Sequence, residues 1–167
     1  IAGRLENTAA GTLAAGIPSG ITISNGTVTL STVGNGLTNV GSLNVTLAGR
    51  FDFTGGTIIF QKPSAASTEL DLGLISGGGT KNTVGGTFQF GNGSTTPPAV
   101  FNISSGITLD RITSDANADL QLNADVLVNQ LALNPSSTID LNGNSLQLLV
   151  SSTGTYTFPI DNGNGVP

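Results

Sequence analysis

Residues 123–150 read NADVLVNQLALNPSSTIDLNGNSLQLLV, and this stretch carries the pattern that decides the fold. It contains four apolar pairs, each with one residue between its members: Val126/Val128, Leu131/Leu133, Ile139/Leu141 and Leu146/Leu148. Short segments rich in Asn, Ser, Gly and Pro separate the pairs. Alternation with a period of two predicts short β-strands with one buried face. Each pair is therefore expected to line the interior, and each polar segment to form a corner.

Segments of the same kind run through most of the chain, and Gly, Asn, Ser or Pro bound each of them. They are residues 21–23, 27–30, 42–47, 50–53, 56–60, 69–75, 86–90, 100–103 and 107–112. Residues 1–16 place apolar side chains four apart, but Gly3 and Gly11 each disfavour a helix by about 1 kcal/mol. Further β-structure is therefore favoured there, and the sequence predicts an all-β protein.

Internal repeats indicate how these strands are arranged. SGITIS at 19–24 returns as SGITLD at 105–110, and TGGTIIFQ at 54–61 returns as VGGTFQFG at 84–91. Together with short strands and irregular connections, they favour a right-handed parallel β-helix (β-solenoid), with an antiparallel β-sandwich as the runner-up. Coils of roughly 20–25 residues in three short strands, stacked at ~4.8 Å, would give about seven coils. We expect an edge or cap segment at 1–16, the β-helix at 17–160 and a linker to a following region at 161–167.

Composition excludes several classes of function. Charged residues make up 9% of the chain and the net charge is −5. The five basic residues are too scattered to form the stripe that a nucleic-acid or anionic-membrane surface needs; they are Arg4, Arg50, Lys62, Lys81 and Arg111. His and Cys are absent, which excludes a Ser-His-Asp triad, disulfides and thiolate metal sites. No apolar run approaches the length of a membrane span. Met is also absent, so we expect a processed product or a segment of a longer protein.

Two groups of acidic residues are the candidate chemical sites. Glu69 and Asp71 lie two apart on one strand face and could form a carboxylate pair of the kind that glycoside hydrolysis uses. The simpler interpretation is two solvated side chains on an outer wall, and we expect no enzyme and no cofactor. Asp115, Asn117 and Asp119 alternate as calcium ligands sometimes do, with Asp110, Asn123 and Asp125 nearby. The spacing matches no EF-hand loop, so a polar corner between two walls is the simpler interpretation there too, with calcium bridging between coils as the alternative.

Aromatic and threonine patterns suggest two further surfaces. Phe51/Phe53 and Phe88/Phe90 each share one strand face, which indicates core packing more than a sugar-stacking platform. Residues 22–32 carry four threonines, and flat Thr ladders on solenoids can bind ice. The Thr-x-Thr pattern does not recur in step, although Thr155 and Thr157 form another such pair.

Four segments of the C-terminal half carry a further pattern: Gly106–Leu109, Leu131–Leu133, Thr138–Leu148 and Gly154–Ile160. With them, this half resembles the β-helical repeat regions of large cell-surface and adhesin-like secreted proteins of Bacteroidetes. This resemblance implies a protein exported to the cell surface or the medium.

We therefore expect a structural extracellular module, a stiff spacer or display segment of a bacterial surface adhesin or filament. Its expected partners are neighbouring domains of the same longer chain or further copies joined end to end. The first alternative is a module that binds surface glycans through one wall or through loops near 61–67 and 92–99. Ice binding and a polysaccharide-active enzyme are further alternatives.

Overall fold

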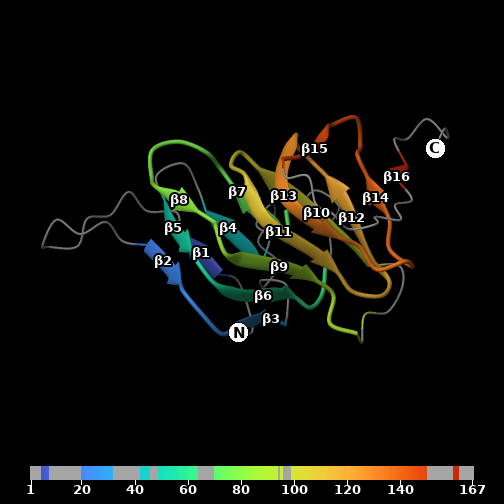
Figure 1. Ribbon diagram of the computed structural model, residues 1–167, viewed down its shortest axis with the longest axis horizontal. Helices are drawn as coiled ribbons and strands as arrows, with labels where there is room; N and C mark the ends of the chain where they lie inside the picture. Colours follow the sequence, from blue (N-terminus) through green and yellow to red (C-terminus); the bar gives the residue numbers. More distant parts are fainter. Residues whose placement is uncertain are drawn as a thin grey trace, which may run out of the picture.

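The computed structural model describes the backbone of residues 5–7, 20–31, 42–45, 49–63, 70–93, 95, 99–149 and 160–161. These residues form sixteen β-strands and no helix (Figure 1). Accordingly, the described part of the chain contains no helix that could cross a membrane. The predicted all-β class is confirmed, and Leu5–Asn7 adds a strand within the segment predicted as an edge or cap.

The strands form three sheets, each named here by its number of strands. The seven-stranded sheet has the order β1 (Leu5–Asn7), β4 (Leu43–Val45), β7 (Leu72–Leu74), β10 (Ala99–Ser105), β12 (Ala118–Leu122), β14 (Ile139–Asp140) and β16 (Ile160–Asp161). The six-stranded sheet has the order β15 (Leu146–Leu148), β13 (Val126–Ala132), β11 (Leu109–Ser114), β9 (Gly86–Phe90), β6 (Gly56–Phe60) and β3 (Thr27–Leu30). The three-stranded sheet has the order β2 (Gly20–Ile23), β5 (Arg50–Phe53) and β8 (Lys81–Asn82).

All pairings among these strands are parallel, and no strand pairs with the next one along the chain. From β2 to β10 the chain visits the three-, six- and seven-stranded sheets in rotation; from β10 onward it alternates between the last two. The colours in Figure 1 therefore follow the chain order across each sheet. The described strands do not form the antiparallel sandwich that was the runner-up.

The number of residues in one circuit changes along the chain. Thr27 pairs with Thr57, and Thr57 pairs with Thr87, so these circuits take 30 residues. Leu120 pairs with Ile139, a circuit of 19 residues. The three-stranded sheet ends at β8, and the shorter circuits follow it. The predicted period of roughly 20–25 residues is close to the circuits of 19 and 20 residues in the second half and too short for those of 30 in the first.

Apolar columns fill the space between the sheets. Ile58, Phe88, Ile112 and Leu131 occupy one register position on four successive strands, and all are buried. Phe51, Phe53 and Phe88 form a second cluster of contacting rings. Phe60 and Phe90 stack with ring centroids 4.7 Å apart, and Phe90 meets Phe101 edge-on at 5.5 Å. These rings are core, as predicted, and make no external platform.

The apolar pairs of residues 123–150 largely face inward. Val126, Val128, Leu131 and Ile139 are buried, whereas Leu133, Leu141 and Leu146 are half-buried. Leu148 is in register with the buried Val128 but is 43% exposed. No described strand pairs with the far side of β15, so that column is open at this end.

Glycines make the corner between the three- and six-stranded sheets. Gly56 and Gly85 have φ angles of +91° and +97°, a region that other residues rarely adopt. Gly86 pairs with Gly56, and a side chain at Gly86 would collide with the ring of Phe53. The repeated Thr-Gly-Gly-Thr and Val-Gly-Gly-Thr segments are therefore repeated corners.

Candidate functional site

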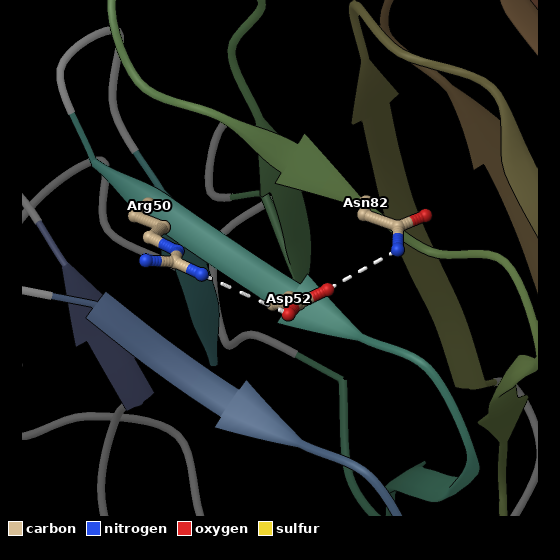
Figure 2. Close-up of polar contacts among 3 residues, drawn as sticks. All are labelled: Arg50, Asp52 and Asn82. Carbon is tan, nitrogen blue, oxygen red and sulfur yellow. Dashed lines mark hydrogen bonds and ion pairs between the residues drawn. The ribbon is translucent and has the colours of Figure 1, made fainter.

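Three polar side chains lie together on the outer face of the three-stranded sheet (Figure 2). Asp52 alternates with the buried Phe51 and Phe53, so its carboxylate points outward. Arg50 Nη2 lies 3.9 Å from Asp52 Oδ2. Asn82 Nδ2 donates to Asp52 Oδ1 at 3.1 Å. Asp52 therefore links a neighbour on its own strand to one on the next.

Strand register explains why these side chains meet. Thr22, Asp52 and Asn82 occupy one position on β2, β5 and β8, and Gly20 pairs with Arg50. A Cβ atom at Gly20 would lie 2.9 Å from Arg50 Cβ, so glycine allows the arginine stem to cross β2. The resulting surface, called here the Arg50 face, offers a guanidinium, a carboxylate, an amide and the exposed Thr22 hydroxyl. Such groups can hydrogen-bond a polyhydroxylated or carboxylated ligand.

The sequence reasoning did not identify the Arg50 face. A usable signal was present, because the echo between 54–61 and 84–91 has the 30-residue offset that also relates residues 22, 52 and 82. The expected period of roughly 20–25 residues was applied to the whole chain and is shorter than this offset.

A second polar column follows the outer side of the seven-stranded sheet. The strand registers place its members one per circuit: Ser42, Asp71, Asn102, Gln121 and Asp140. The main-chain N–H of Asn102 donates to Asp71 Oδ2 at 2.8 Å, and Gln121 Nε2 donates to Asp140 Oδ2 at 3.0 Å. The column thus connects successive circuits by side-chain hydrogen bonds.

Asp71 corrects one interpretation made from the sequence. A solvated side chain was expected, but Asp71 is completely buried, and Asn102 beside it is 2% exposed. Leu70 lies just before β7, packs beside Gly73 of that strand and covers part of this outer face. Its predicted companion, Glu69, lies outside the described residues, so no carboxylate pair is defined.

The candidate calcium ligands point to different partners. Asp115 Oδ1 accepts from the N–H of Ala116 at 2.8 Å, and Asp119 Oδ1 accepts from the N–H and Oγ1 of Thr138 at 2.7 and 2.9 Å. Asn117 has a φ of +62°, and its N–H donates to Ser136 Oγ at 3.3 Å. Within the described ranges, no three acidic side chains gather as a metal-binding group. Residues 115–117 form a polar corner, as expected, whereas Asp119 lies on β12, and both parts are tied to the following circuit.

Two other acids make similar connections between circuits. Asp110 accepts from the N–H of Gly85 at 2.8 Å and from Asn129 Nδ2 at 2.9 Å, so it contacts the circuit before and the circuit after its own. Asp125 Oδ1 accepts from both the N–H and Oγ of Ser145 at 2.8 Å. The backbone hydrogen bond from Ser145, then that from its hydroxyl, lowers the pKa of Asp125. Elsewhere, burial lowers the pKa of Lys81, which neighbours Asn82.

One threonine column is present on the six-stranded sheet. Thr27, Thr57 and Thr87 are in register on β3, β6 and β9, and the position continues as Arg111. The neighbouring outward position reads Thr29, Ile59 and Gln89, so the described strands carry no two-column Thr array. The pair Thr155 and Thr157 lies outside the described residues, and ice binding stays a prediction from sequence.

The loops named as possible binding elements are described only in part. Residues 61–63 and 92–93 with Thr95 are described, whereas 64–69, Ser94 and 96–98 are not. Asn92 N–H donates to Thr95 Oγ1 at 3.3 Å within the second loop.

No protein-family model matches the chain, and neither a curated protein nor a solved structure is significantly similar to it.

Proposed function

We propose that the three sheets are the walls of a right-handed parallel β-solenoid of about seven coils, one per strand of the seven-stranded sheet. The carrying observation is that strands pair in parallel with strands a full circuit away, in register, on every wall. Right-handed crossover is the usual hand for parallel strands joined in this way. In this geometry most side chains serve to stack one coil on the next, so few residue types remain for catalysis.

We further propose that this solenoid is a stiff spacer or display segment of an extracellular bacterial surface protein. Inward columns such as Phe60–Phe90 join successive coils by apolar contact. Outward bonds such as Asp119–Thr138 and Asp125–Ser145 join them by polar contact. The resemblance of the C-terminal half to adhesin-like repeat regions supports the extracellular setting. Neighbouring domains or further copies joined end to end would be its partners.

Limited proteolysis tests the spacer proposal. A protease of broad specificity is required, because the chain has only five Lys and Arg residues. We expect the isolated chain to leave a resistant fragment that includes 99–149, since cleavage requires local unfolding of paired strands. Rapid cleavage throughout β9–β13 would contradict a stiff shaft.

Glycan binding is a second candidate, favoured by the Arg50 face. Arg50 and Asp52 are 40% and 30% exposed at their side chains, so both reach solvent on an exposed sheet. We expect Arg50→Ala to reduce binding on a glycan array. Arg111→Ala is the matched control, because Arg111 lies away from the Arg50 face on the six-stranded sheet, where its Nε donates to Gln130 Oε1. Equal binding by the two variants would exclude the Arg50 face as the glycan site.

A further inference from the structure

The hydroxyl oxygen of Ser42 is unusual because it is buried and unpaired. Its side chain is 1% exposed, and its hydroxyl is the one buried side-chain N or O atom of the described residues without a hydrogen-bond partner. An unpartnered buried hydroxyl is unfavourable, and proteins normally pair such a group with another group, water or an ion. The position of Ser42 therefore points to something bound beside it.

Asp71 lies next to Ser42 on the neighbouring strand. Leu43 pairs with Leu72, and Leu43 N–H donates to the carbonyl of Asp71 at 2.9 Å. Ser42 and Asp71 thus occupy one register position, about one strand spacing of 4.8 Å apart. Each precedes a buried, inward-facing leucine, so both belong to the outer side of the sheet. A buried carboxylate accordingly stands beside the buried hydroxyl.

Asn44 supplies a third oxygen on the same side of β4. It lies two residues after Ser42 and pairs with Gly73. A Cβ atom at Gly73 would lie 3.3 Å from Asn44 Oδ1 and 3.4 Å from Leu70 Cδ1. Glycine therefore leaves space beside the amide oxygen, and Leu70 helps to screen that space from solvent.

The chemistry of these groups selects the ligand. A hydroxyl, an amide oxygen and a carboxylate are hard oxygen donors, and Ca²⁺ prefers six to eight such ligands at about 2.3–2.6 Å. We propose that Ser42, Asn44 and Asp71 bind a calcium ion between β4 and β7. Asp71 can do so while Oδ2 accepts from Asn102, because each carboxylate oxygen has two lone pairs. The net charge of −5 also favours a cation. The ion would join two successive coils.

The test uses the whole chain after removal of metal by chelation. Thermal unfolding is followed during titration with CaCl₂, with NaCl at matched ionic strength as the salt control. We expect Ca²⁺ to raise Tm, because it binds only the folded state. Ser42→Ala should melt at the same or a higher temperature than the original chain without Ca²⁺, and bind Ca²⁺ about tenfold or more weakly by calorimetry.

Ser137→Ala is the matched control. Ser137 is also a buried serine, but its hydroxyl donates to the carbonyl of Asp115 at 2.9 Å. This variant should lose stability and keep the full Ca²⁺ response. Asp71→Asn preserves the shape and an acceptor oxygen while removing the charge, and it should lose the response.

Two results would overturn the proposal. One is a chain whose Tm and calorimetric titration do not respond to Ca²⁺, with Ser42→Ala simply more stable; the hydroxyl would then hold water only. The other is an undiminished Ca²⁺ response in Ser42→Ala or in a folded Asp71→Asn variant, which would place the ion elsewhere.

Discussion

At the scale of single residues, outward-facing aspartates connect segments that lie about one parallel-strand repeat apart in the chain. Asp119 and Asp125 each use one oxygen to accept from the N–H and hydroxyl of a residue 19 or 20 positions later. Their partners, Thr138 and Ser145, immediately precede β14 and β15. The carboxylate thereby satisfies a main-chain donor at the point where strand pairing begins.

The Asp125 connection predicts a dependence of stability on pH. Its folded pKa lies below its unfolded value, so it stabilises the fold above the unfolded pKa. That contribution is lost as the pH falls through the folded pKa. Asp125→Asn should therefore flatten the acid limb of a plot of unfolding free energy against pH. Urea unfolding across the acid range measures this.

Ser145→Ala provides the matched comparison for Asp125. It removes the hydroxyl donor and keeps the main-chain donor, so the acid limb should flatten only in part. An acid limb that neither variant alters would show that this pair does not contribute.

The close packing around Gly86 predicts that a larger side chain at this corner lowers stability. Gly86→Ala would place a methyl group against the ring of Phe53, which is itself fully buried. We expect a loss of about 1–3 kcal/mol in unfolding free energy, the usual result of overpacking. Thr87→Ala, on the adjacent outward position, is the control and should change stability little. Similar losses in both variants would show that crowding against Phe53 is not the cause.

At the scale of elements, strand prediction succeeded where inward and outward residues alternate cleanly. The predicted strands at 27–30, 50–53, 56–60 and 86–90 match β3, β5, β6 and β9. In contrast, β12 at Ala118–Leu122 was missed, because Asp119 was assigned to a polar corner. Its apolar residues, Ala118, Leu120 and Leu122, do alternate, but acidic and amide neighbours masked them.

Candidate sites were harder to predict than strands, since they depend on register. The Arg50 face joins residues 30 apart, and the Ser42–Asp71 pair joins residues 29 apart. Neither spacing forms a local motif. Nor could the sequence show that Asp71 is buried, because alternation places it outward and Leu70 covers this face.

The stacked phenylalanine rings predict that a buried ring of β9 contributes strongly to stability. Phe90 contacts both Phe60 and Phe101 and is fully buried. Phe90→Ala should lower the unfolding free energy by about 3–5 kcal/mol through lost burial and a remaining cavity. Gln89→Ala, beside it on the outer face, is the control and should cost much less. Chemical denaturation of both variants gives the comparison.

At the scale of the whole molecule, the parallel register predicts that one complete coil can be removed. Deleting residues 126–145 would bring β15 into the position of β13, because Leu146 already pairs with Val126. We expect a folded chain, shortened along its axis by about one strand spacing of 4.8 Å. Circular dichroism checks the fold, and small-angle scattering checks the length.

A half-coil deletion of residues 126–135 is the control for that experiment. It breaks the register between β14 and β12, so buried and exposed positions no longer coincide. This variant should unfold or aggregate. If both deletions behave alike, the stacked arrangement is wrong.

If the sheets are the walls of the proposed solenoid, the shortening of the circuit from 30 to 19 residues would give its two ends perimeters of different length. A second copy placed on either end would then meet a perimeter of a different size, and part of the wider rim would find no strand to pair with. Of the two kinds of partner proposed above, such a taper would favour neighbouring domains, each fitted to one rim, over further copies joined end to end.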